Sequence, residues 1–186
     1  MNVYLIKRVN DLLHSYNKEL LSDNYWTDAD GTKTTFKHML SMIEDYVKCG
    51  KSIYVGSDSM RYTAKCIFVT AICLHDNENR RSHYFYSRHK TDPGSFCDLR
   101  SRIFKEVEDS LEVGAMLNDL ISEASIEIHI DIGKGKKSRT RKYFDTVSGW
   151  VKSLGFVFKT KPNSWASSSV ADWHTKRIAV HAGGER

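Results

Sequence analysis

The chain has 186 residues and a formal net charge of +5 with neutral histidines. This length fits one domain that buries roughly two thirds of its unfolded surface. Hydrophobic residues make up 40% and charged residues 27% of the chain, which excludes a chain that is disordered throughout. No apolar run approaches the length of a signal-peptide core or a membrane span, so we expect a cytoplasmic protein with no membrane partner.

Cysteine spacing and net charge indicate which kinds of site and partner the protein can have. The four cysteines include no Cys-x-x-Cys pair, so we expect reduced thiols in place of a zinc site or a redox centre. The mildly basic balance permits a polyanionic partner without requiring one.

The N-terminal part of the sequence predicts helices. Apolar residues recur at helical spacing over 3–21, and again up to residue 48 behind a pair of threonines that can cap the second helix. We expect residues 1–48 to form a helical extension packed on a domain that spans residues 49–186.

The rest of the chain alternates between strand and helix patterns. Three segments rich in β-branched and aromatic residues, separated by turn signals, predict an antiparallel meander over 51–60, 65–75 and 81–89. The pattern then predicts a helix, a strand, a helix, a strand and a last helix, over 96–122, 125–132, 138–154, 155–161 and from 167. This order predicts an α/β fold with a mixed five-stranded sheet flanked by helices.

Acidic residues stand where these elements would deliver side chains to one end of the sheet. Asp58 follows the apolar run of the first predicted strand, and Asp131 follows that of the fourth. Ligands of open α/β sheets gather at the carboxyl ends of strands. Asp172 lies near the start of the last helix, between apolar neighbours. Each acid alone would also fit a turn former or a partner of the helix dipole.

The long helix offers four further acids, which differ in their angular position. A helical wheel places Glu106 at the edge of the apolar stripe, where its side chain can look along the sheet. The same wheel predicts that Glu108, Asp109 and Glu112 face water. Only Glu106 therefore joins the candidate site.

The set of four carboxylates favours a particular chemistry. Gathered together, they would repel one another and raise their own pKa values unless cations neutralised them. Oxygen ligands favour Mg²⁺ or Mn²⁺, and two such ions can activate water and stabilise the leaving oxygen of a phosphodiester. We therefore expect Asp58, Glu106, Asp131 and Asp172 to be both metal ligands and catalytic residues.

Basic residues cluster directly after the fourth strand. Phosphate contacts of a nucleic acid would explain this local density, although a solvated loop would also fit. The candidate nucleic-acid-binding residues, with two from the last strand, are Lys134, Lys136, Lys137, Arg139, Arg141, Lys142, Lys159 and Lys161. The candidate accessory residues are Ser59 and His174.

The runs IYVGSDSM, FVTAICLH, IEIHIDIG and GFVFKTKPNSWASSSVADWHTK resemble the YkuK-type ribonuclease H-like family over about residues 34–176. In the wider superfamily the catalytic acids are Asp on the first strand, Glu on the first helix, Asp ending the fourth strand and Asp on the last helix. The resemblance places Asp58, Glu106, Asp131 and Asp172 at those four positions.

Two departures narrow the subtype. A proofreading exonuclease of this superfamily would carry Asp-x-Glu on the first strand, where this chain has Asp58, Ser59 and Met60. An integrase-like enzyme would carry Glu on the last helix, where this chain has Asp172. Cleavage of the ribonuclease H or junction-resolvase type is the better match.

The resemblance implies a metal-dependent nuclease that acts on RNA, an RNA/DNA hybrid or structured DNA by a two-metal mechanism. The alternatives are a noncatalytic nucleic-acid-binding module with the same fold, and a protein-interaction domain in which the acids only cap turns and helices. Retention of all four acids favours the nuclease, because a dead site has no electrostatic reason to keep like charges together.

Overall fold

The structure is a computed structural model that describes residues 18–23, 25–62, 65–76, 81–92, 94–96 and 98–176. In chain order its elements are η1 (Lys18–Leu21), β1 (Thr27–Asp28), α2 (Phe36–Lys48), β2 (Ile53–Tyr62), β3 (Lys65–Asp76), β4 (Arg81–Lys90), α3 (Leu99–Leu120), β5 (Ile126–Gly133), η2 (Arg141–Tyr143), α4 (Phe144–Ser153), β6 (Val157–Lys161) and η3 (Ala166–Ala171). The last of these is a π-helical turn within a longer helix over 165–176. The predicted helix over 3–21 lies outside the described residues except for its end, which is the 3-10 turn η1.

A single mixed sheet forms the centre of the fold, with the strand order β1-β4-β3-β2-β5-β6. Strands β2, β3 and β4 form the predicted antiparallel meander. Strand β5 pairs in parallel with β2, and β6 pairs in parallel with β5. The five predicted strands are confirmed. The sixth, β1, adds an edge of two residues beside β4, which is too short to produce a period in the sequence.

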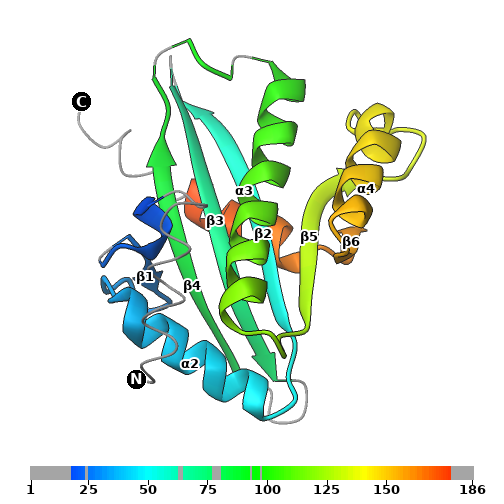
Figure 1. The fold of residues 1–186 in the computed structure, drawn as a ribbon. Coiled ribbons are helices and arrows are strands. Elements are labelled where there is room, and N and C mark those ends of the chain that lie inside the picture. The colour runs from blue at the N-terminus through cyan, green and yellow to red at the C-terminus, as the bar shows by residue number, and fades with distance from the viewer. Residues whose placement is uncertain are drawn as a thin grey trace.

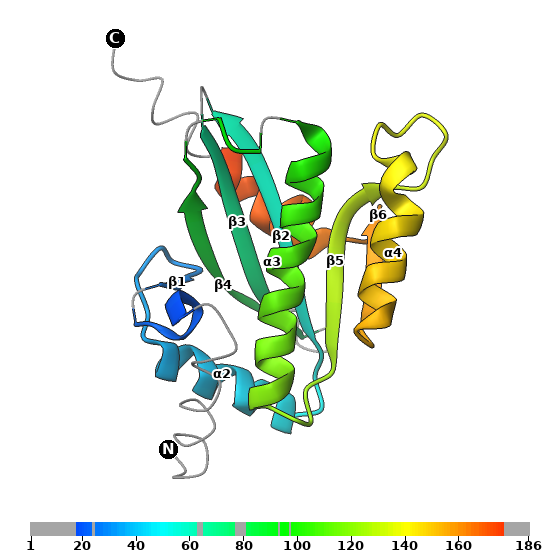
Figure 2. The same cartoon turned by 45° about the horizontal axis from the view of Figure 1, so that its top comes forward.

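Helices cover both faces of this sheet. Helix α3 crosses one face, and the C-terminal helix over 165–176 crosses the other (Figure 1). Helix α2 lies across the end of the sheet at which β2 begins, and α4 flanks β5 and β6 (Figure 2). The large apolar core lies between the sheet and helices α2, α3 and α4. A smaller apolar cluster lies under the C-terminal helix. The described residues contain no helix with the length and hydropathy that a bilayer crossing requires.

Side-chain caps set the helix starts. The Thr35 side chain accepts a hydrogen bond from the His38 N–H, so α2 begins at Phe36 as predicted. Asp98 accepts from the Ser101 N–H at 2.9 Å, so α3 begins at Leu99, later than the apolar pattern predicts. Helix α4 also begins later than predicted, because residues 138–143 form turns before it.

Two glycines allow the helices on the two faces to approach the sheet closely. A β-carbon at Gly114 of α3 would lie 2.9 Å from the Cδ1 atom of Ile128 on β5. A β-carbon at Gly56 of β2 would lie 2.6 Å from the backbone nitrogen of Ser167. Both approaches are tighter than a side chain allows. They hold the helices that carry Glu106 and Asp172 against the strands that carry Asp58 and Asp131.

Candidate metal and nucleic-acid site

The site begins where β2 and β5 stop pairing. Their last register pair is Gly56 with His129. Asp58 and Asp131 each stand two residues further along, and because side chains alternate along a strand, they share the face of Gly56 and His129. That face is covered by the C-terminal helix, since the Ala166 N–H donates to the His129 Nδ1 atom at 3.0 Å. The two aspartates therefore lie at the carboxyl ends of neighbouring parallel strands, just beyond the last residues that pair.

His129 fixes the start of the helix that covers this face. Its Nδ1 atom accepts from Ala166, so the proton lies on Nε2, which donates to the Glu127 Oε1 atom at 2.9 Å. Burial lowers the pKa of His129, which agrees with a neutral ring. We conclude that His129 orients the helix that delivers Asp172.

Asp58 is held by that helix. Its carboxylate is 8% exposed, and the Thr175 hydroxyl donates to its Oδ2 atom at 2.6 Å. Burial, together with the charges of Asp172 and Asp131, raises the pKa of Asp58 to about 6, and the hydrogen bond from Thr175 opposes the rise. These repulsions indicate that the three aspartates share one electrostatic environment.

Asp131 and Asp172 each pair with a lysine. The Lys161 Nζ atom lies 2.8 Å from the Asp131 Oδ1 atom. The Lys176 Nζ atom lies 2.6 Å from the Asp172 Oδ2 atom, four residues earlier on the same helix. Two ammonium groups therefore supply the positive charge beside these carboxylates.

Glu106 reaches the site from the other face of the sheet. Ser59 of β2 donates to its Oε1 atom at 2.6 Å. Burial and the charges of Asp58 and Asp131 together raise the pKa of Glu106 to about 8, and the hydrogen bond from Ser59 opposes the rise. Glu106 and Asp131 also line one narrow crevice between α3 and β5. All four predicted acids are thus coupled through Asp58 and Asp131.

The donor set can be compared with the needs of a divalent ion. Four carboxylates with mutual repulsion match Mg²⁺ or Mn²⁺ in charge and donor type. Over the part of the chain that the structure describes, however, no three histidine, cysteine or acidic side chains lie close enough to hold one ion together. In this structure the carboxylates of Asp131 and Asp172 instead contact the ammonium groups of Lys161 and Lys176.

The two candidate accessory residues lie in different surroundings. Ser59 touches Glu106, as described above. The ring of His174 is buried and stacks on Tyr86, with ring centroids 3.6 Å apart, and its Nε2 atom lies 3.2 Å from the Tyr84 hydroxyl. His174 thereby fastens the C-terminal helix to β4.

The basic segment over 134–142, called the basic loop below, leaves β5 directly after Asp131. All six of its cations are exposed, and it extends beyond the end of the sheet beside α4 (Figure 2). Arg141 donates to the Lys134 carbonyl at 2.7 Å, which ties the loop into a compact turn. On β6, Lys159 lies 3.8 Å from Glu127, and Lys161 already pairs with Asp131.

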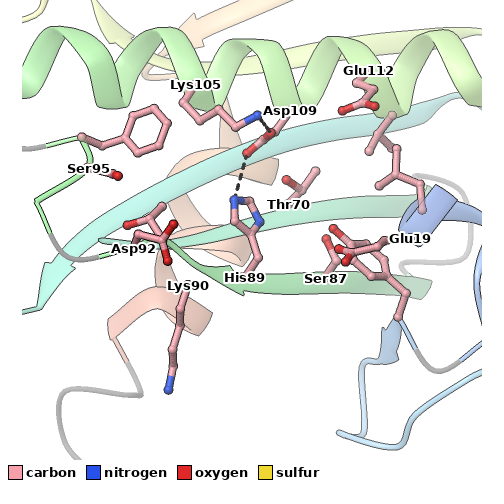
Figure 3. Close-up of a pocket in the computed structure, with 15 residues that line it drawn as sticks. Glu19, Thr70, Ser87, His89, Lys90, Asp92, Ser95, Lys105, Asp109 and Glu112 are labelled. Carbon is pink, nitrogen blue, oxygen red and sulfur yellow. Dashed lines mark ion pairs between the residues drawn. The ribbon is translucent and has the colours of Figure 1, made fainter. Parts of the chain in front are cut away.

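One prediction about α3 is wrong. The side chain of Glu108 is 55% exposed, as predicted, but Asp109 is buried and Glu112 is half-buried. The wheel assumed that these acids face water, whereas Asp109 and Glu112 line a polar cavity between α3 and strands β3 and β4 (Figure 3). Lys105 compensates the buried charge, since its Nζ atom lies 3.0 Å from the Asp109 Oδ1 atom.

Sequence reasoning also missed two residues that touch the acids. Thr175 and Lys176 follow Asp172 at the spacings that share one helix face, and they bond to Asp58 and Asp172. That spacing is a signal that could have identified both residues.

Comparisons with known proteins cover the region of the chain that holds the four acids. The family model described as Ribonuclease H-like matches residues 34–176. The Bacillus subtilis (strain 168) protein named "Uncharacterized protein YkuK" is 28% identical over 161 residues, which cover 76% of this chain and 91% of that protein. The matched region contains all four acids.

Proposed function

This chain is a YkuK-type member of the ribonuclease H-like family, and from that premise we propose that it is a metal-dependent nuclease. Its substrate would be the phosphodiester backbone of RNA, an RNA/DNA hybrid or structured DNA. The observation that carries the proposal is the electrostatic coupling of Asp58 with Asp131 and Asp172, and of Glu106 with Asp58 and Asp131. A fold has no structural need for such repulsion, and bound cations relieve it.

In this proposal, some residues would hold the metal ions and others orient the carboxylates that hold them. Asp58, Glu106, Asp131 and Asp172 would hold Mg²⁺ or Mn²⁺. When bound, such ions supply an activated water and charge stabilisation for the leaving oxygen. Thr175 orients Asp58, and Ser59 orients Glu106. The raised pKa values of Asp58 and Glu106 mean that ion binding must displace protons, so metal affinity should rise with pH.

Cations around the site would position the substrate. The basic loop follows Asp131 directly, so a nucleic acid with its scissile phosphate at the carboxylates passes within reach of the loop. When a metal ion replaces Lys161 and Lys176 as the partners of Asp131 and Asp172, these two ammonium groups can contact phosphate oxygens instead. These contacts would bind the backbone without reading its sequence.

A cleavage screen tests the proposal. Single-stranded, duplex, hybrid and branched substrates are incubated with the protein in Mg²⁺ or Mn²⁺, beside the variants Asp58→Asn and Asp131→Asn. Both variants should stay folded and lose metal-dependent cleavage, because the amide removes ligand charge at nearly constant shape. Asp45→Asn, at an exposed residue of α2, is the matched control and should cleave normally. Equal cleavage by all four proteins would refute the assignment.

The lysine pairs favour one second candidate, a noncatalytic nucleic-acid-binding module. In that case Lys161 and Lys176 permanently neutralise the acids, and binding needs no metal. The two functions separate in the same screen, because the module would bind substrate in EDTA and cleave nothing in Mg²⁺ or Mn²⁺.

A further inference from the structure

A row of three aromatic rings connects α3 with α4 and the turn before it. The Phe104 ring of α3 lies between those of Tyr143 and Trp150, with ring centroids 6.2 Å and 6.3 Å away. The two helices flank β5 (Figures 1 and 2), so this row, called the aromatic row below, extends from one side of the strand to the other. All three side chains are half-buried, so each keeps part of its surface in contact with solvent.

Cations lie over two of these rings. The Arg100 Cζ atom is 5.6 Å from the centroid of the Phe104 ring, and the Lys142 Nζ atom is 5.0 Å from that of Tyr143. Both cationic side chains are exposed. A contiguous group of partly exposed apolar side chains with a polar rim is typical of a binding surface.

The charge beside the aromatic row indicates the kind of ligand. Residues 132–144 contain six lysines and arginines and no acidic residue. Hydrogen bonds hold this segment in place, since the Thr140 Oγ1 atom accepts from the Gly133 N–H at 3.0 Å and the Ser138 hydroxyl lies 2.9 Å from the same atom. Concentrated positive charge next to aromatic rings suits a strand of nucleic acid, which presents both phosphates and planar bases.

Two short stretches of chain connect the aromatic row with the four acids. Phe104 lies on the same turn of α3 as Glu106, and the chain runs from Asp131 through the basic loop into Tyr143. A nucleic-acid strand with one phosphate at the acids therefore reaches the row as it passes the basic loop.

The arrangement of the rings favours an unpaired strand. The centroid separations of 6.2 Å and 6.3 Å are nearly twice the rise of about 3.4 Å between successive nucleotides of a duplex strand. The ring planes of Phe104 and Tyr143 are also 81° apart, whereas the bases of a duplex are parallel and stack on one another. Only unpaired bases can turn their faces toward such rings, as they do in proteins that bind single strands.

Base stacking can displace the cations from the rings. An exposed cation–π contact changes an equilibrium constant about two- to fivefold, whereas stacking of one base on an aromatic side chain changes it about fivefold to more than a hundredfold. The exchange therefore favours the base, and it frees Arg100 and Lys142 to contact phosphates.

We propose that the aromatic row binds single-stranded nucleic acid, with bases stacked on Tyr143, Phe104 and Trp150 and with phosphates held by the basic loop. The substrate is then an unpaired strand, or an unpaired segment next to the cut. This assignment deepens the proposed function and rests on its nucleic-acid substrate.

Fluorescence anisotropy in EDTA tests this surface in the absence of cleavage. The probes are labelled oligo(dT) and oligo(U) of about 12 nucleotides, the duplex of oligo(dT) with oligo(dA), and an abasic strand that keeps the phosphates but lacks the bases. The parent protein should bind at least one base-bearing single strand about fivefold or more tightly than the duplex and the abasic strand. The abasic probe needs no variant, so it tests the role of the bases even where a ring replacement unfolds the protein.

Tyr143→Leu and Trp150→Leu each remove a ring and keep an apolar side chain. Each should weaken binding of the single strand about fivefold or more and leave binding of the abasic strand unchanged. The dependence of log K on log[salt] should stay that of the parent, because no cation is removed. Phe158→Leu is the matched control and should bind as the parent does, because Phe158 is a half-buried ring with a lysine over its face but lies outside the row.

Three results would overturn the proposal: equal affinity of the parent for base-bearing and abasic strands, tighter binding of the duplex than of the single strands, or the same loss of affinity in Phe158→Leu as in the two row variants. Cleavage in Mg²⁺ or Mn²⁺ is measured separately. A parent that cleaves, with row variants that bind every probe as the parent does, would uphold the nuclease and overturn the role of the row. Base-dependent binding that the row variants lose, without cleavage of any probe, would support the row and remove the nuclease assignment.

Discussion

The exchange Asp58→Asn should stabilise the metal-free protein at pH 8 and change its stability little at pH 4. Burial and the charges of Asp172 and Asp131 raise the pKa of Asp58 from 3.8 to about 6. Each pKa unit corresponds to about 1.36 kcal/mol, so ionising this carboxyl group in the folded protein costs about 2–3 kcal/mol. Asparagine keeps the shape and an acceptor for Thr175 but has no charge to ionise.

The pH window follows from the direction of the shift. A carboxyl group with a raised pKa binds its proton more tightly in the folded than in the unfolded chain. Its stabilising contribution is complete below about pH 4 and is lost as the pH rises through about 6. Glu106 has a pKa of about 8, so the loss of folding stability with rising pH continues through that value. Removing the Asp58 charge also lowers the pKa of Glu106, because that charge is one of the causes of its raised value.

Urea unfolding between pH 4 and pH 8 in EDTA measures this effect. The unfolding free energy of Asp58→Asn minus that of the parent should grow from near zero to about 2–3 kcal/mol. Asp45→Asn, whose carboxylate is exposed on α2, should show no such growth. A pH-independent difference, or a variant that is less stable than the parent at pH 8, would refute the electrostatic account of the site.

Three further predictions test other parts of the structure. Gly56→Ala should lower the unfolding free energy by about 1–3 kcal/mol, because its methyl group would meet the backbone of the C-terminal helix; an unchanged urea midpoint would contradict that close contact. Joint replacement of Lys136, Lys137 and Arg139 by Ala should flatten the dependence of log K on log[salt] by about two for nucleic-acid binding; a slope equal to the parent's would make the basic loop a solubilising feature. Lys161→Gln should raise Mn²⁺ affinity by up to about fivefold, because a partly exposed ion pair contributes about 0.2–1 kcal/mol; unchanged or weaker affinity in a calorimetric titration would show that this lysine does not compete with the ion.

Periodicity predicted the strands and helices well, because one face of each element is buried. The alternating isoleucines of β5 put His129 and Asp131 on one face, and the structure confirms that His129 faces the C-terminal helix. The apolar stripe of α3 separated Glu106 from the exposed Glu108 for the same reason. Local patterns carry such information because burial repeats along the chain.

Local sequence patterns could not predict contacts between segments that are far apart in the chain. The burial of Asp109 depends on β4 lying opposite α3, which no period of the helix encodes. The pairing of Lys161 with Asp131 depends on the register between β5 and β6. These features arise from tertiary packing, which sets the partners of a charge independently of its position on a helical wheel.

The most direct test of the account is the anomalous scattering of Mn²⁺ in crystals soaked at pH 8. We predict a peak within coordination distance of the carboxylates of Asp58 and Asp131, and its loss in crystals of Asp58→Asn. The Lys161 ammonium should have moved away from Asp131 in the soaked crystals. A peak that is absent, or one that persists unchanged in the variant, would contradict the claim that these carboxylates form a metal site.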